Sequence, residues 1–141
     1  MKILHVLNSN KYSGAENVVC QIINMFAEDA DTEMVYCSPD GPIRENLEEY
    51  GISFAPIASL CSSELKRVIA EQNPDVIHAH DFRASMISTS VAKKIPVISH
   101  LHNNGLWLKS IGIKTVAFAA SCRKYKKSLQ MPCSCSPIGK S

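Results

Sequence analysis

The sequence predicts an α/β domain built on a doubly wound, mostly parallel, Rossmann-like sheet. Short apolar runs typical of buried strands alternate along the chain with segments whose apolar residues recur at helical spacing. Clusters of glycine, proline, asparagine and serine separate the two kinds of segment. Strands that alternate with helices form parallel sheets joined by right-handed crossovers. The chain has 141 residues, enough for one domain of this kind with a buried core.

The N-terminal segment, which ends at Phe26, predicts a strand, a polar loop and a helix. An apolar run ending at Leu7 is expected for a strand buried on both faces. Ser13 and Glu16 form a capping box, so we expect the helix to begin near Gly14. In open α/β sheets, a helix that begins just beyond a strand is a place where anions and nucleotides bind.

The rest of the chain repeats this unit. Gly51 is placed to end one helix, and Asn73 ends another because the residue before a proline avoids helical geometry. The predicted strands are 33–37, 52–57, 75–80 and 97–101, and the predicted helices lie near 42–50, 62–72, 84–91 and 106–125.

The C-terminal segment differs from the repeating units. Residues 128–141 contain two prolines, two cysteines and four serines, and they show no strand or helix period. We therefore expect one domain over residues 1–127 and an irregular tail over residues 128–141.

Composition excludes several classes of protein. The net charge of +2 is too small to indicate a nucleic-acid partner. No apolar stretch reaches the roughly 20 residues needed to cross a bilayer, and the first apolar run is too short for a signal peptide. Several of the six cysteines stand singly beside regular elements, which is typical of free thiols in a reducing compartment. We expect a cytoplasmic protein.

A basic cluster follows the last apolar segment. It consists of Arg123, Lys124, Lys126 and Lys127. Such a cluster suits peripheral contact with anionic lipid, and it equally suits the solvated end of a helix, where cations complement the helix dipole. Both interpretations stay open from the sequence alone.

The first possible site is the start of the first helix. Gly14 has no side chain, so a phosphate can approach the backbone there. Neither the dinucleotide fingerprint nor the P-loop pattern is present in the sequence. The alternative is an ordinary capped helix that follows a turn.

The second possible site is a pair of His-x-His motifs at the ends of two predicted strands. Residues two apart share a face of a strand, and the carboxyl ends of parallel strands open into the ligand crevice. His80 and His102 come last in each motif and suit hydrogen bonds to a sugar hydroxyl or a phosphate. His78 and His100 are more simply core histidines. A metal site formed by these four histidines, with the Asp81 carboxylate beside His80, is a further alternative. No catalytic triad is visible, so these residues predict ligand binding without identifying a reaction.

Three segments in order resemble the N-terminal domain of family 4, GT-B type glycosyltransferases. They read KILHVLNSNKYSGAENVV, NPDVIHAHDFRAS and IPVISHLHNN, and the resemblance extends from Met1 to about Lys127. These enzymes typically open with a strand, a loop ending in Gly-Gly-x-Glu, and a helix. Later they have a Pro-Asp-hydrophobic-hydrophobic-His-x-His segment. The chain has Ser13-Gly14 where the family often has two glycines.

The resemblance implies roles for individual residues. It implies that Gly14 and Ala15 contact the donor diphosphate, and that His80 is a catalytic residue directed at the transferred sugar. It implies no metal and no other cofactor. The implied cleft and acceptor residues are Asn10, Asp81, Arg83, His102 and Asn103.

The resemblance also implies a function. Family members of this type transfer a sugar from a nucleotide-sugar to a glycan or lipid-linked acceptor with retention of configuration, many of them in bacterial polysaccharide biosynthesis at the cytoplasmic membrane face. The sequence ends where a sixth strand and a donor-binding domain with a Glu-x7-Glu motif are expected. We therefore expect no transfer without a second domain or chain. The alternatives are a non-catalytic nucleotide- or sugar-binding partner subunit and a metal-dependent hydrolase.

Overall fold

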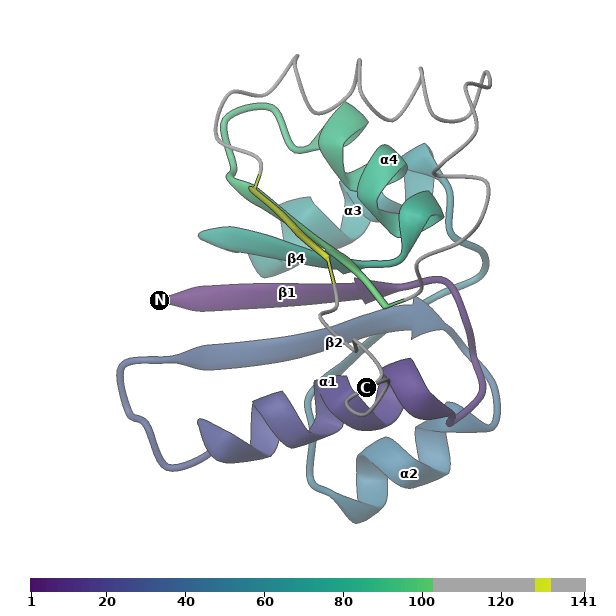
Figure 1. Ribbon diagram of the computed structural model, residues 1–141, viewed down its shortest axis with the longest axis vertical. Helices are drawn as coiled ribbons and strands as arrows, with labels where there is room; N and C mark the ends of the chain where they lie inside the picture. Colours follow the sequence, from purple (N-terminus) through teal and green to yellow (C-terminus); the bar gives the residue numbers. More distant parts are fainter. Residues whose placement is uncertain (103–128, 133–141) are drawn as a thin grey trace, which may run out of the picture.

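The computed structural model describes residues 1–102 and 129–132 and shows one parallel sheet with helices on both faces (Figure 1). The strand order is β3-β2-β1-β4-β5-β6, and every pair of neighbours is parallel. The predicted doubly wound α/β class is therefore confirmed. The strands are β1 (Lys2–Leu7), β2 (Glu33–Pro39), β3 (Phe54–Ile57), β4 (Val76–His80), β5 (Val97–Leu101) and β6 (Leu129–Pro132), and the helices are α1 (Gly14–Met25), α2 (Ile43–Glu49), α3 (Ser62–Gln72) and α4 (Phe82–Val91).

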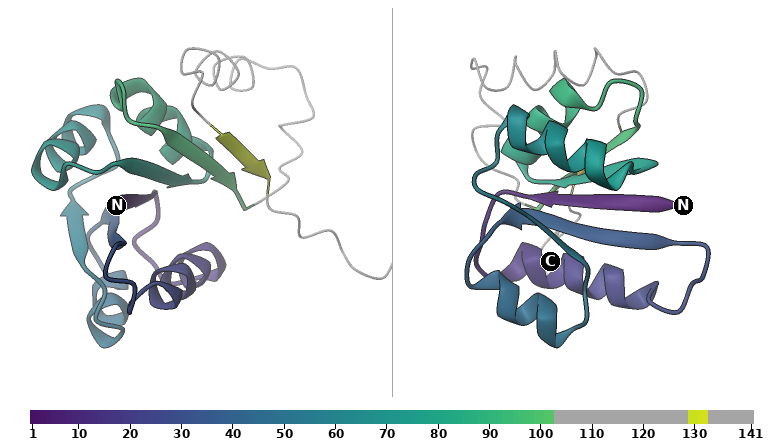
Figure 2. Two further views of the ribbon diagram at one scale, coloured as in Figure 1. Left: turned by 90° about the vertical axis from the view of Figure 1, so that its left-hand side faces the viewer. Right: turned by 180° about the vertical axis from the view of Figure 1, so that it is seen from behind.

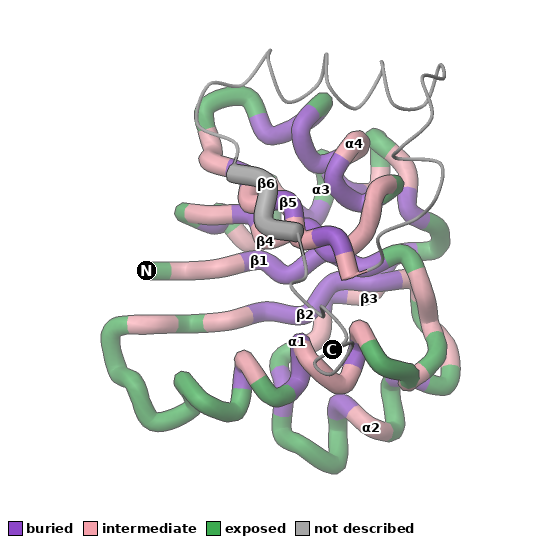
Figure 3. The backbone as a smooth tube through the Cα atoms, viewed as in Figure 1, coloured by how far each residue is buried: buried purple, intermediate pink, exposed green. Residues whose placement is uncertain are grey.

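Two helical layers enclose the sheet. Helices α1 and α2 lie together on one side, and α3 and α4 lie together on the other (Figure 2). Along β1, Leu4 and Val6 join the core beneath α3 and α4, whereas Leu7 joins the core beneath α1 and α2. Because neighbouring strand residues point to opposite faces, this alternation buries β1 on both sides, most completely in its C-terminal half (Figure 3).

The strand register fixes which residues meet at the edge of the sheet. Leu7 of β1 pairs with His80 of β4, and His80 pairs with His100 of β5. The carboxyl ends of β1, β4 and β5 therefore lie side by side. The strand order reverses between β1 and β4, and ligands of open α/β sheets bind at such a reversal.

Most predicted boundaries agree with the structure to within two residues. Helix α1 begins at Gly14 as predicted, and the capping box is formed: the Glu16 carboxylate accepts from the Ser13 N–H at 3.2 Å and from its hydroxyl at 2.5 Å. Helix α3 ends at Gln72, and Asn73 follows with a left-handed φ of 48°. The predicted strand 97–101 is confirmed in full.

Strand β6 corrects the expectation of an irregular tail. Leu129–Pro132 pairs in parallel with β5, inside the segment 128–141 that we expected to be without regular structure, so a sixth strand does follow. Four residues are too few to show an alternating pattern, and the strand is defined by hydrogen bonds to β5 rather than by its own sequence. The division into residues 1–127 and 128–141 remains a prediction, and the predicted helix 106–125 lies outside the described residues.

The described residues also bear on the cysteines and on the membrane. Cys20 and Cys37 are buried free thiols, as predicted, and Cys61 is a half-buried one. Among the helices of residues 1–102, none combines the length and the apolar character that a bilayer crossing requires.

Gly51 and Gly14 differ in backbone conformation, and alanine substitutions at both positions test this difference. Gly51 has a φ of 64° just beyond α2, whereas Gly14 has no such constraint and a Cβ added there would meet no atom within 4 Å. We expect Gly51→Ala to lower the free energy of unfolding by about 1 kcal/mol, since a left-handed backbone crowds a Cβ. Urea unfolding of both variants measures this, with Gly14→Ala as the control that retains wild-type stability. Equal stability of the two variants would contradict the left-handed assignment at Gly51.

Candidate functional site

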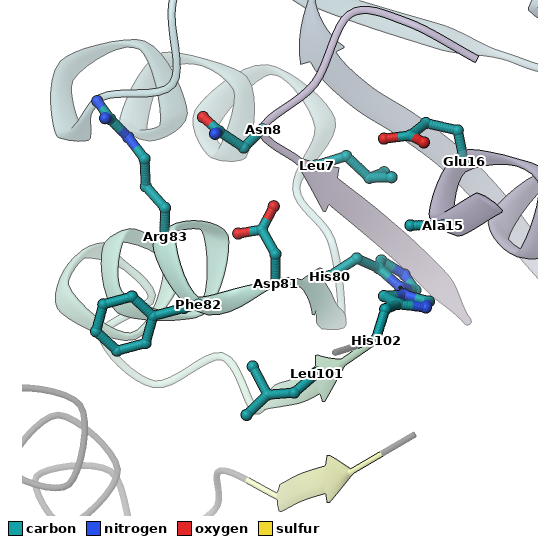
Figure 4. A pocket seen from close by; sticks show the side chains of 10 residues that line it. All are labelled: Leu7, Asn8, Ala15, Glu16, His80, Asp81, Phe82, Arg83, Leu101 and His102. Atoms are coloured by element: carbon teal, nitrogen blue, oxygen red, sulfur yellow. Dashed lines mark hydrogen bonds between the residues drawn. The ribbon is translucent and has the colours of Figure 1, made fainter. Parts of the chain in front are cut away.

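A cavity of about 470 Å³ lies at the carboxyl edge of the sheet, where three strands end and two helices begin (Figure 4). Its volume falls in the range of small-molecule sites. The strands contribute their last residues and the exit loops that follow, and the helices contribute their first turns. The lining residues are Leu7, Asn8, Ala15, Glu16, His80, Asp81, Phe82, Arg83, Leu101 and His102.

The cavity brings together five of the residues singled out in the sequence. These are Ala15, His80, Asp81, Arg83 and His102. Gly14 is the exposed first residue of α1 and directly precedes the lining residue Ala15. The strand ends and the helix start that the sequence indicated therefore do meet in one place.

Apart from Gly14, one predicted residue that the structure describes does not join this group. Asn10 lies against the loop between β2 and α2, where its side-chain amide donates to the Asp40 carbonyl at 3.1 Å. Its own carbonyl accepts from the Ile43 N–H at 2.9 Å, so Asn10 holds this loop rather than lining the cavity. Asn103 lies outside the described residues.

Glu16 is a cavity residue that the sequence analysis treated only as a helix cap. It is 4% exposed, and its carboxylate lies over the N-terminus of α1, where it accepts both bonds from Ser13. A diphosphate at Gly14 and Ala15 would therefore share the helix N-terminus with this carboxylate. Four further lining residues were not predicted as site residues: Leu7, Asn8, Phe82 and Leu101. Their positions at a predicted strand end or helix start are the sequence feature that could have indicated them.

Asp81 links the end of β4 to the start of α4. Its carboxylate caps the helix by accepting from the Ala84 N–H at 2.8 Å, and its N–H donates to the His100 carbonyl at 2.9 Å. Burial raises the pKa of this carboxyl above its ordinary value. Its φ of 99° and ψ of 172° lie in a region that only glycine adopts freely, at a cost of roughly 1–3 kcal/mol. Backbone strain of this kind concentrates at functional sites.

All five histidines of the chain gather on the face of the sheet that α1 covers. They come from the middle of β1 and from the ends of β4 and β5, and the ring centroids of stacked pairs lie 4.1 Å apart for His78 and His80 and 4.2 Å apart for His100 and His102. His5 was not foreseen, because its pairing with β4 is a property of the sheet register rather than of any local motif.

Three of these rings form a hydrogen-bonded row. His5 Nδ1 lies 3.0 Å from His80 Nε2, and His80 Nδ1 lies 2.9 Å from His102 Nε2. Both ring nitrogens of His80 are therefore engaged with other imidazoles, and the residue is only 1% exposed. His102 keeps its Nδ1 without a hydrogen-bond partner in the part of the chain that the structure describes. Among the described residues, His102 is thus the cavity-lining histidine that has a ring nitrogen outside the row.

Burial keeps the inner rings neutral. It lowers the pKa of His5 to about 3, with a further contribution from His78, and it lowers the pKa of His78 to about 4, with further contributions from His100 and His102. The pKa of His80 is shifted well below its ordinary value by burial and then by the surrounding histidines. Neutral imidazole both donates and accepts, and it is also the form that binds metals.

Two triplets of the cluster have ring nitrogens close enough for a transition-metal site. They are His5 with His78 and His80, and His80 with His100 and His102, each triplet within 4.8 Å. However, both ring nitrogens of His80, the residue that the two triplets share, are engaged in hydrogen bonds of the row. Imidazoles are suitable metal ligands. In this cluster the ring nitrogens of His80 are placed for hydrogen bonds to other imidazoles rather than for a metal.

The sequence matches Glycosyltransferase Family 4 over residues 12–130. The chain belongs to this family. The match includes every described lining residue except Leu7 and Asn8. A glycosyltransferase-related role follows, and the resemblance noted in the sequence is confirmed at the level of the family.

Solved structures share the fold of this family 4 chain. HepE (Alr3699) of Anabaena in complex with UDP superposes with a TM-score of 0.72 at 18% identity, covering 89% of this chain and 36% of HepE. MurG of Acinetobacter baumannii gives a TM-score of 0.62 at 12% identity, covering 92% of this chain and 40% of MurG. The chain thus spans less than half the length of either protein. No curated protein sequence matches it.

The buried histidines of the family 4 chain predict a pH dependence of stability. An unfolded histidine takes up a proton near its ordinary pKa of 6.5, whereas folded His5 resists until about pH 3. Between these values the unfolded state binds more protons, so the free energy of unfolding should fall as the pH falls below 6.5. The expected slope is up to about 1.4 kcal/mol per pH unit for each histidine held neutral.

Urea unfolding between neutral pH and about pH 5, where carboxylates stay ionised, measures this slope. His5→Gln should flatten it, and His100→Gln, whose ring is half-buried, should flatten it less. A wild-type slope in His5→Gln would show that His5 is not held neutral.

The hydrogen-bonded row predicts the metal content. We expect protein purified without a histidine tag to contain no stoichiometric zinc or nickel, because binding would break the two bonds that His80 makes. Elemental analysis after dialysis provides the measurement. About one zinc per chain, lost in His80→Ala, would overturn this prediction and favour a metal site.

Proposed function

We propose that this chain is the acceptor-side domain of a glycosyltransferase that moves a sugar from a nucleotide-sugar to a glycan or lipid-linked acceptor. The observation that supports this most directly is the coincidence of two findings. The family match over residues 12–130 includes α1 and the His-x-His strand ends, and the cavity lies where these elements meet. A place in bacterial polysaccharide biosynthesis is part of the proposal and rests on the resemblance.

The donor diphosphate is proposed to lie against Gly14 and Ala15 at the start of α1. Support comes from the free space around Gly14, where an added Cβ would meet no atom within 4 Å, and from the first-turn amides of the helix. HepE, a structural neighbour, has been crystallised with UDP and with UDP-glucose. The nearby Glu16 carboxylate opposes a second anion, so we propose that diphosphate binding to this wall of the cleft is weak.

The sugar is proposed to meet His102, with His80 behind it. Among the described residues His102 has a ring nitrogen without a partner. His80 is proposed to act on the sugar through His102, because both of its own nitrogens are engaged. The catalytic importance proposed for His80 is then the positioning of His102. Asp81 and Arg83 are proposed for the acceptor side, on the first turn of α4. The acceptor roles of Asn10 and Asn103 have no support from the cavity itself.

The proposed reaction is a substitution at the anomeric carbon. The bond from this carbon to the diphosphate oxygen breaks, the acceptor hydroxyl oxygen bonds to the same carbon, and the hydroxyl proton ends on the departing diphosphate. Retention of configuration is proposed by resemblance, without a metal. Neutral imidazoles suit this chemistry, because they orient hydroxyl groups without adding charge to the cleft.

A second wall of the cleft belongs to the proposal. The chain spans 36–44% of the solved neighbours, so a further domain or chain is proposed to bind the base and ribose of the donor. Peripheral contact of a cytoplasmic enzyme with the inner membrane face is proposed from the basic residues at 123–127, which lie outside the described residues. A nucleic-acid partner is not proposed.

The 141-residue chain alone should bind UDP-glucose more weakly than micromolar and transfer no sugar. One wall of a cleft encloses little ligand surface, and affinity depends on enclosure and on preorganised contacts. Isothermal titration and a transfer assay with radiolabelled donor on membrane extracts measure this. Micromolar affinity, or transfer without a second chain, would refute the half-cleft proposal.

An NMR titration with UDP locates the weak binding through changes in backbone amide chemical shifts, and two variants of α1 test the location. We expect UDP to perturb the amides of Gly14 and Ala15, and Gly14→Ala to weaken the perturbation without loss of stability. Gln21→Ala, on the exposed side of the same helix, is the control that should bind as wild type. Perturbations confined to other regions would identify a different binding module and contradict the assigned diphosphate site.

A further inference from the structure

A thioether closes the inner end of the histidine row. Met34 Sδ on β2 lies 3.4 Å from His5 Nε2, and the row continues from His5 Nδ1 to His80 Nε2 at 3.0 Å and from His80 Nδ1 to His102 Nε2 at 2.9 Å. The row thus crosses three strands beneath α1 and ends at the cavity, where Figure 4 shows the rings of His80 and His102 next to each other. Its two ends are chemically different.

Only two arrangements of protons satisfy this row. A neutral imidazole has one N–H donor and one acceptor nitrogen, so each ring must donate in one direction and accept from the other. Burial keeps His5 and His80 neutral, with pKa values below the ordinary range. Either all three rings are protonated on Nδ1 and donate outwards, or all three are protonated on Nε2 and donate inwards.

Met34 distinguishes these two arrangements. A thioether sulfur has lone pairs and no hydrogen, so it accepts weakly and never donates. His5 is 0% exposed, which leaves bulk solvent no contact with its Nε2. In the outward arrangement the bare Nε2 lone pair would face the sulfur lone pairs, and a buried acceptor would stay without a donor. In the inward arrangement His5 Nε2–H donates to the sulfur and every member of the row is satisfied.

We propose that Met34 fixes the tautomer of the whole row, so that His5, His80 and His102 each hold their proton on Nε2 and His102 presents a bare Nδ1 to the cavity. Met34 and His5 then act as positioning residues for a ring that lies three strands from Met34 and two strands from His5. The assignment of the tautomers rests only on the contacts among Met34, His5, His80 and His102. The consequence for a ligand rests on the proposed function: a bare nitrogen accepts a hydrogen bond, so this point of the cavity suits a hydroxyl group of a sugar rather than an unprotonated phosphate oxygen.

The stacked histidines beside the row do not change this order. His78 and His100 have no hydrogen bond to the row among the described residues, and the Nε2 of His78 is buried without a partner. The Glu16 carboxylate is bonded to Ser13 rather than to a ring of the row. Burial lowers the pKa of His102 at the other end of the row, and Glu16 acts on that ring only through its charge, which raises the pKa. Met34 is therefore the group that contacts an end of the described row at hydrogen-bond distance.

Nitrogen NMR of the full chain without ligand tests the tautomers. Long-range proton–nitrogen correlation at neutral pH distinguishes protonated from bare ring nitrogens, and His78→Gln and His100→Gln identify the signals that do not belong to the row. We expect a protonated Nε2 and a bare Nδ1 for His5, His80 and His102. Protonation of Nδ1 on His5 or His80, or averaged signals from both tautomers, would overturn the proposal.

Removal of the sulfur tests the cause. Met34→Leu keeps the volume but has no acceptor, so the two arrangements should become comparably populated and the row signals of His80 and His102 should double or average. Met25→Leu, at a 79% exposed methionine, is the matched control and should leave every ring on Nε2. An unchanged single tautomer in folded Met34→Leu would show that Met34 does not set the order.

The wild-type spectrum decides the tautomers even if Met34→Leu does not fold. The same spectrum tests the tautomers independently of the proposed function. Failure of the chain to bind UDP or UDP-glucose would leave the measured tautomers as they are, and an Nδ1-protonated row would overturn the inference whatever the chain transfers.

Discussion

The parallel register of β1 with β2 and β4 is the constraint on which the rest of the structure depends. It places Leu7 beside His80 and His5 beside His78, and it brings Met34 of β2 next to Ile3 of β1, close to His5. A shift of β1 by one residue would turn His5 and Leu7 to the opposite face, and this would break the hydrogen-bonded row and change the cavity wall. The same register buries Leu4 and Val6 under the other helical layer, so the apolar core and the polar cluster stabilise one and the same alignment.

Burial gives the polar cluster its chemical character. Five imidazoles on one face would repel one another if they were charged, but the pKa values of His5, His78 and His80 are lowered until these rings are neutral. Neutral rings can satisfy one another by hydrogen bonds, which removes most of the cost of burying them. The charge at the cavity comes instead from Glu16, Asp81 and Arg83, on the first turns of α1 and α4 and the loop before α4. The cavity lining therefore combines neutral imidazoles with ionisable side chains at the helix starts.

Local sequence patterns predicted much of this fold and part of the site. The capping box of Ser13 and Glu16 depends on residues three apart, and the strand 97–101 depends on an apolar run, so both were readable and both are confirmed. The His-x-His ends of β4 and β5 also followed from chain order, because parallel strands finish at one edge. Strand β6 was not readable, since its four residues are defined by pairing with β5, and Asn10 was assigned to the cleft although it holds the β2–α2 loop.

The sequence by itself determined the α/β class, the family resemblance and the edge of the sheet at which ligands are expected, because each depends on periodicity or on order along the chain. Only the tertiary structure decided which of the two cavity-lining histidines keeps a ring nitrogen without a partner among the described residues. His80 appeared the more prominent residue in the sequence, yet His5 and His102 occupy both of its ring nitrogens. The contact of Met34 with His5 depends on two strands meeting in register, and no pattern within either strand encodes it. Hydrogen-bond direction in a buried row is a property of all its members together, so it emerges only when the sheet has assembled.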